Sequence, residues 1–191
     1  MPSPSSSTSN ATCGPGSYLP AGFRTRIATV DSGRGLLVAQ ALRRALARVG
    51  ITAELRVFPA DVYLSAGAGA PKAVTDGGLG LAVVSWVTDF PSPAAFYPPL
   101  LDGRAARTLG NTDFAQLGDA KLDQACDAAA ATLDRTAATD RWRQVDGSAM
   151  GLGAYLPLAE DRAVLLAGTR VRNAYVHLAW RNYDLARIGV R

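Results

Sequence analysis

An apolar run opens residues 79–93 (LGLAVVSWVTDFPSP), and two prolines close them. A short apolar run that is bounded by breaking residues predicts a buried strand rather than a half-exposed one. Trp86 and Asp89 follow at the point where this strand, which we expect to be central, would leave its sheet. Open α/β sheets bind their ligands at that edge. The pattern therefore predicts a binding position directly after the run.

The segments before this run alternate between strand and helix patterns. Residues 23–30 are typical of a strand, and residues 51–58 alternate with one apolar face. Between them, residues 34–49 place apolar side chains at helical spacing and three arginines on the opposite side. A strand, a helix and a second strand in this order predict two parallel strands joined by a right-handed crossover. The expected fold class is therefore α/β.

The segments after residue 58 predict mainly helices, with two further strands near the end. Residues 61–64 indicate a short helical turn, and residues 66–78, which carry four glycines and a proline, indicate a loop. Two amphipathic helices are expected to form a hairpin: residues 119–133, capped by Asp119, and residues 137–150. Strands are expected over residues 155–167 and 170–176.

The inner stripes of the two predicted helices supply a candidate core. Apolar residues recur three or four positions apart, as expected for helix faces that pack on one another. The residues expected to point inward are Leu122, Cys126, Ala129 and Leu133 in the first helix, and Ala138, Trp142, Val145 and Ala149 in the second.

Length and composition narrow the possible classes. A chain of 191 residues, of which 48% are hydrophobic and 19% charged, is enough for one globular domain or for a part of a larger protein. Residues 1–22 are rich in serine, proline and glycine, and predict a disordered leader. The net charge of +4 is dispersed, whereas nucleic-acid-binding domains cluster their basic residues, so we expect no nucleic-acid partner.

Residues that could support catalysis or metal binding are few. His177 is the only histidine, and the two cysteines, Cys13 and Cys126, lie far apart, so we expect no metal site. Ser85 and Ser148 have no base at a suggestive distance along the chain. The glycine-containing stretches lack the lysine–serine ending of a phosphate loop, and we expect no cofactor. The sequence therefore does not predict an enzyme.

Seven short stretches follow one another in a characteristic order after residue 23. They are Arg48-Val-Gly-Ile51, the octet Trp86-Val-Thr-Asp-Phe-Pro-Ser-Pro93, Asn111-Thr-Asp-Phe114, Asp123 in its helix, Asp134 with Arg141 and Trp142, Ala154-Tyr-Leu-Pro-Leu158, and Tyr183-Asp-Leu185. In this order and spacing they resemble the family-5 extracellular solute-binding proteins of bacterial ABC importers, which carry oligopeptides, dipeptides or nickel complexes.

The resemblance implies one lobe of a type II periplasmic-binding-protein-like fold, which has two lobes, with a mixed sheet flanked by helices. Residues 23–191 would be the C-terminal lobe, and residues 177–191 a tail that in full-length members returns to the N-terminal lobe, which this chain lacks. The implied partners are a peptide or similar small solute and the permease subunits of the importer. The implied location is the periplasm or the extracellular face of the cell membrane. The sequence as written opens without a secretory signal, which leaves a cytoplasmic location open.

The resemblance also implies a ligand-binding segment, formed by Ser85, Trp86, Val87, Asp89 and Phe90. In peptide-binding members the acid of the octet pairs with the α-ammonium group of the ligand, which assigns that role to Asp89. The alternative is that Asp89 caps the turn that follows it. Trp86 is either a wall of the solute pocket or a core residue. A second functional hypothesis stays open, namely a remnant or interaction domain that has lost solute capture.

Overall fold

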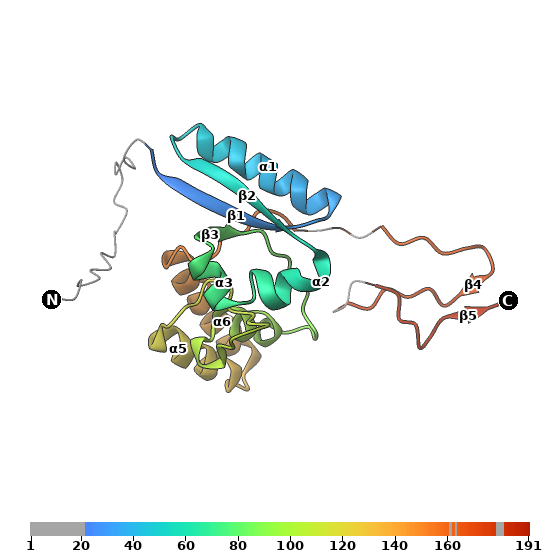
Figure 1. The fold of residues 1–191 in the computed structure, drawn as a ribbon. Coiled ribbons are helices and arrows are strands. Elements are labelled where there is room, and N and C mark those ends of the chain that lie inside the picture. Colours follow the sequence, from blue (N-terminus) through green and yellow to red (C-terminus); the bar gives the residue numbers. More distant parts are fainter. Residues whose placement is uncertain (1–21, 161, 163, 179–181) are drawn as a thin grey trace, which may run out of the picture.

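A computed structural model describes residues 22–160, 162, 164–178 and 182–191. The leader expected over residues 1–22 lies outside the described residues, apart from Gly22. Figure 1 shows a small sheet with helices on both faces, followed by a long segment that runs away from this body toward the C-terminus.

The sheet confirms the predicted α/β class. Strands β1 (Arg24–Val30) and β2 (Thr52–Phe58) pair in parallel, and helix α1 (Gly33–Ala47) connects them. The helix begins where a polar side chain can satisfy its first N–H groups: Ser32 Oγ accepts from the backbone N–H of Gly35 at 3.1 Å. A third parallel strand, β3 (Leu79–Ala82), pairs with the other side of β1.

Two details of the predicted sheet were wrong. The strand order is β2-β1-β3, so the central strand is β1, and the apolar run supplies an edge strand that ends at Ala82. Leu81 is 41% exposed because β3 has no neighbour on its outer side among the described residues. The sheet is also parallel throughout rather than mixed. Antiparallel pairing occurs in a separate ribbon of β4 (Val171–Arg172) and β5 (Gly189–Val190).

The two faces of β1 are buried by different layers (Figure 1). On one face, Ile27 packs with Ala39 of α1 and Ala53 of β2. On the other face, Ala28 packs with Tyr63 and Ala68. Tyr63 belongs to the π-helical turn η1 (Tyr63–Gly67), which α2 (Ala60–Val62) precedes; Ala68 follows η1 directly, and α3 (Pro71–Asp76) adds Val74 to this layer.

The loop predicted over residues 66–78 is instead largely helical. Pro71 occupies the first turn of α3, where its missing N–H costs nothing. Lys72 Nζ lies 2.6 Å from Asp76 Oδ2, an ion pair between side chains one turn apart. The glycines and the proline therefore mark the ends of a helix rather than an irregular segment.

The helical hairpin is confirmed, and it forms a second core. Helix α5 (Ala120–Ala130) begins at Asp119, whose carboxylate accepts from the backbone N–H groups of Lys121 and Leu122. Helix α6 (Arg135–Gly151) packs against it. Leu133 was wrongly expected inside: α5 has already ended, and the side chain is 99% exposed. The short helices η2 (Pro93–Ala95), α4 (Tyr97–Leu101) and η3 (Gly103–Ala105) complete this part. The buried residues of this core are Leu100, Leu101, Leu122, Cys126, Ala129, Trp142, Val145 and Ala149.

The strand expected over residues 155–167 was wrong for the residues that are described. None of them forms a strand, and four of their apolar side chains lie in solvent. Leu156, Leu158, Val164 and Leu166 are 75%, 52%, 85% and 88% exposed. A segment with strand-forming residues becomes a strand only where another strand pairs with it, and none lies beside this segment among the described residues.

We expect Ile27→Ala to lower the free energy of unfolding by about 2–5 kcal/mol, because it removes a fully buried side chain and leaves a cavity. Leu37→Ala is the matched control: leucine and isoleucine have the same atoms, but Leu37 is 66% exposed on α1, so the change should be within about 0.5 kcal/mol. Urea denaturation followed by circular dichroism measures both. Equal effects of the two variants would contradict the assigned core.

Candidate functional site

The segment that carries the predicted site leaves the carboxyl end of β3 and is held there by Tyr63. The Tyr63 hydroxyl lies 2.8 Å from the carbonyl oxygen of Val83 and 3.1 Å from that of Ala28. The backbone N–H of Val83 donates to the same Ala28 carbonyl at 2.9 Å. Burial raises the pKa of Tyr63, so its hydroxyl stays a neutral donor. One buried side chain thus fixes the point from which residues 84–90 extend.

The five predicted site residues lie along one strip, residues 85–90, and their side chains have different orientations. Trp86 points inward: its Nε1 donates to the carbonyl oxygen of Ala95 at 3.2 Å, and its ring packs on the helical core. The other four face solvent, and they are Ser85, Val87, Asp89 and Phe90, with Val87 62% and Phe90 48% exposed. The core interpretation of Trp86 is therefore the better supported one.

The turn after the strip has its own cap. Ser92 Oγ accepts from the backbone N–H of Ala94 at 3.3 Å, which starts η2. The backbone N–H of Ser92 donates to the carbonyl oxygen of Phe90 at 2.8 Å. Ser92 is therefore the cap of η2, two residues after the strip.

Asn111 and Asp113 are buried, and hydrogen bonds of Asn111 hold their turn against the segment that follows η1. Asn111 Nδ2 donates to the carbonyl oxygen of Asp113 at 2.7 Å, and its backbone N–H donates to Gly69 at 2.8 Å. Both oxygens of Asp113 lack a well-aligned hydrogen bond from the described residues. Burial raises the pKa of Asp113 to about 6, outweighing the nearby N–H groups of residues 115–117, which lower the pKa.

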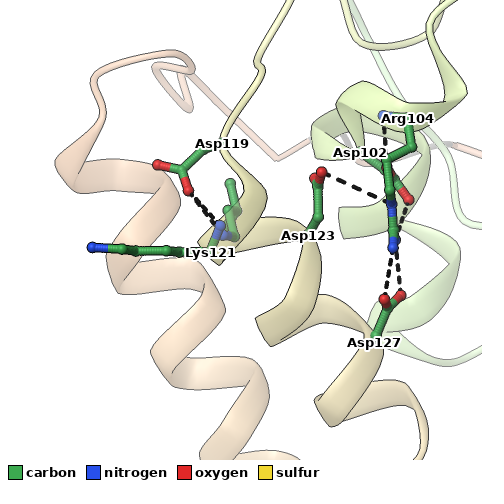
Figure 2. Close-up of polar contacts among 7 residues, drawn as sticks. Asp102, Arg104, Asp119, Lys121, Asp123 and Asp127 are labelled. Carbon is green, nitrogen blue, oxygen red and sulfur yellow. Dashed lines mark hydrogen bonds and ion pairs between the residues drawn. The ribbon is translucent and has the colours of Figure 1, made fainter.

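Figure 2 shows an arginine held among three aspartates, which the sequence did not reveal as a unit. Arg104 contacts both carboxylate oxygens of Asp102, with Nε at 2.9 Å and Nη2 at 2.7 Å. It also contacts both oxygens of Asp127, at 2.7 and 2.9 Å, while Asp123 Oδ2 lies 3.8 Å from its Nε. The hydrogen bonds to Arg104 lower the pKa of Asp102 and Asp127.

The arginine cluster ties η3 to α5 and is best explained as a structural contact. Two guanidinium hydrogen bonds run from Arg104 to Asp127 across the two elements and two more run to Asp102 beside η3, so Arg104 donates them in forked pairs within the chain. One signal in the sequence could have indicated it: Asp123 and Asp127 are like charges one helical turn apart, which favours a cation beside them.

Two classes of site find no support in the part of the chain that is described. There, no group of three or more histidine, cysteine, aspartate or glutamate side chains could hold a metal ion. No helix in that same part has the length and apolar character to cross a bilayer.

Solved structures of binding proteins match the chain over most of its length. The clavulanic acid biosynthesis oligopeptide binding protein 2 matches with 38% identity and a TM-score of 0.85, covering 90% of this chain and 31% of that one. The periplasmic binding protein DppA of Helicobacter pylori, in complex with the peptide STSA, matches with 19% identity and a TM-score of 0.71, covering 90% and 32%. The dipeptide binding protein of Pseudoalteromonas sp. SM9913, in complex with Met-Leu, matches with 16% identity and a TM-score of 0.68, covering 90% and 33%.

No protein-family model and no curated protein matches the sequence. At the lower identities the likeness shows the fold alone: the chain has part of the fold of a periplasmic binding protein. The 38%-identical structure is that of an oligopeptide binding protein. The chain is therefore a structural match to the family-5 solute-binding proteins, which are the oligopeptide, dipeptide and nickel binding proteins of ABC importers. It spans about a third of the length of these proteins.

We expect the contribution of Asp113 to stability to fall as the pH rises. Its folded pKa, about 6, lies above the ordinary 3.8, so the folded state binds more protons than the unfolded chain between these values. The stabilising contribution of Asp113 is therefore fully present below pH 4. About 2–3 kcal/mol of the free energy of unfolding is lost as the pH rises through 6.

The Asp113→Asn variant tests this expectation. Urea denaturation between pH 4 and 7 gives the free energy of unfolding of the wild-type chain and of the variant. The difference between these two free energies should change across this pH range. An unchanged difference across the window would contradict the raised pKa.

Proposed function

We propose that residues 23–191 are the C-terminal lobe of a peptide-binding protein of an ABC importer, and that the strip Ser85–Phe90 lines one side of the solute cleft. The carrying observation is the position of the strip: four exposed side chains at the carboxyl end of a parallel sheet, in a chain that is 38% identical to an oligopeptide binding protein. Ligands of open α/β folds bind at this edge.

Asp89 is the residue that we propose contacts the solute directly, through the α-ammonium group of a peptide. A carboxylate and an ammonium group form a charge-assisted hydrogen bond, but this bond contributes little while both groups face water. Asp89 is exposed in this chain. The bond becomes strong only when a second lobe closes and removes the water. The peptide then binds the closed state more tightly than the open state, and this difference in affinity stabilises the closed state.

The exposed residues after the helical hairpin support the same proposal. Leu156, Leu158, Val164 and Leu166 alternate along one segment, and no described element covers them. Larger apolar surfaces of this kind mark contacts with another protein surface. We propose that they contact the remaining two thirds of the protein, together with the tail over residues 177–191, and that the whole protein acts outside the cytoplasm beside permease subunits.

A second candidate function is an interaction domain that captures no solute. The orientation of Trp86 favours it, because the indole N–H is already used by Ala95 and the ring packs on the core. The two candidates differ in whether the strip binds peptide once a complete cleft exists.

A chimera separates these candidates: this chain replaces the corresponding third of the 38%-identical oligopeptide binding protein. Isothermal titration calorimetry with di- to pentapeptides should show binding to the chimera and much weaker binding to the isolated chain. Asp89→Asn in the chimera should weaken the binding of peptides with a free N-terminus by about 2–5 kcal/mol, because a desolvated ammonium group loses its partner.

Two controls accompany this measurement. Glu54→Gln makes the same carboxylate-to-amide change on β2, away from the strip, and should leave affinity unchanged. N-acetylated peptides should bind Asp89→Asn and the unchanged chimera alike. Equal binding of free and acetylated peptides by the unchanged chimera would remove Asp89 from this role, and a folded chimera that binds no peptide would favour the interaction domain.

We also expect the isolated chain to self-associate through its exposed leucines. Size-exclusion chromatography with light scattering should give a mass above that of a monomer, and the double substitution Leu156→Glu and Leu166→Glu should shift it toward the monomer. Leu37→Glu, an equally apolar and exposed position on α1, should have no such effect. A wild-type chain that runs as a monodisperse monomer would oppose this expectation.

A further inference from the structure

A hollow of about 480 Å³ lies beside the strip and shares none of its five residues. One side is formed by Pro91, Ser92, Pro93 and Tyr97, and the other side by α6. The α6 residues that line it are Arg135, Ala138, Thr139, Trp142, Arg143 and Asp146. The hollow therefore has an apolar side and a helix face that carries charges.

The apolar side has a fixed geometry. The rings of Tyr97 and Trp142 are stacked, with centroids 5.7 Å apart and an interplanar angle of 16°. Tyr97 donates its hydroxyl hydrogen to Asp146 Oδ1 at 2.9 Å, and burial, chiefly, raises the pKa of Tyr97 to about 12. Trp142 is only 7% exposed, so Tyr97 and the prolines supply most of the accessible wall. A flat apolar group can pack on such a wall.

The charges around the hollow favour an anion. Its lining contains two guanidinium groups and one carboxylate, and that carboxylate, Asp146, already accepts from Tyr97. Arg143 uses Nη1 to contact Asp140 at 2.7 Å, and both side chains are largely exposed. Arg135 makes no ion pair with any other residue that the structure describes, and its neighbour Asp134 uses its carboxylate to accept from the backbone N–H of Ala137 at 2.8 Å, as the cap of α6.

We propose that this hollow binds a small organic carboxylate that carries a flat apolar group, with the carboxylate at Arg135 and the apolar group on Tyr97 and the adjacent prolines. Arginine suits this role because its planar fork matches a carboxylate with two parallel hydrogen bonds. Arg143 lies about 12 Å further along the helix axis and adds a favourable field at the far end. The site does not depend on the solute cleft proposed above.

The probes are 3-phenylpropionate and its neutral counterpart 3-phenylpropan-1-ol, titrated into the complete 191-residue chain. The readout is the indole N–H signal of Trp142 in a proton–nitrogen correlation spectrum, assigned with Trp142→Phe. We expect saturable binding of the carboxylate in the millimolar range, at least about five-fold tighter than binding of the alcohol, since exposed charge pairs are worth about 1 kcal/mol.

Three substitutions locate the site. Arg135→Gln should weaken the binding of the carboxylate at least about five-fold while leaving the affinity for the alcohol unchanged. Arg141→Gln, on the same helix but outside the lining, should have no effect. Asp89→Asn should also have no effect, which separates this site from the solute cleft.

Several results would overturn the proposal. These are equal affinity for acid and alcohol, full affinity in Arg135→Gln, or no saturable shift of the Trp142 signal in a chain that is folded by circular dichroism. Loss of binding in Asp89→Asn would assign the ligand to the strip instead. Failure of peptide binding in the chimera would leave the proposal intact, because no residue of the strip lines the hollow.

Discussion

The burial of β1 on both faces is the constraint on which the rest of the structure depends. Ile27, Ala28 and Thr29 are consecutive and fully buried, so helices must cover both sides of the sheet. Such cover requires crossover connections, and these make neighbouring strands parallel. Parallel strands in turn bring their carboxyl ends to one edge, where Tyr63 bonds to Ala28 and Val83. The position of the candidate strip therefore follows from the burial of one strand.

The sequence predicted those elements whose formation depends on local spacing. The βαβ unit and the helical hairpin have apolar positions at the required periods, and the caps Ser32 and Asp119 stand where each helix begins. Segments whose structure depends on a partner were predicted poorly. Residues 155–167 were expected to form a strand, but no described strand pairs with them. The glycines around α3 hid a helix, because Gly and Pro at helix ends resemble those of a loop.

The candidate site was predicted from its place in the chain, whereas the orientation of its side chains depends on contacts. Spacing alone could not show that Trp86 bonds to Ala95 while the acid three residues later faces solvent. The cluster around Arg104 was missed for the same reason: Arg104 and Asp127 are far apart in sequence and meet only when η3 packs on α5. The result is an exposed strip on a well-packed α/β body, with an acid whose attraction for an ammonium group is weak until water is removed.

The central claim is that residues 85–90 contact the bound peptide when the cleft is complete. Hydrogen–deuterium exchange of the chimera, with and without a bound peptide, tests this most directly. We predict slower exchange of the backbone amides of residues 85–90 in the presence of peptide, with no change on the outer face of α1. Peptide binding that leaves exchange in residues 85–90 unchanged would contradict the account.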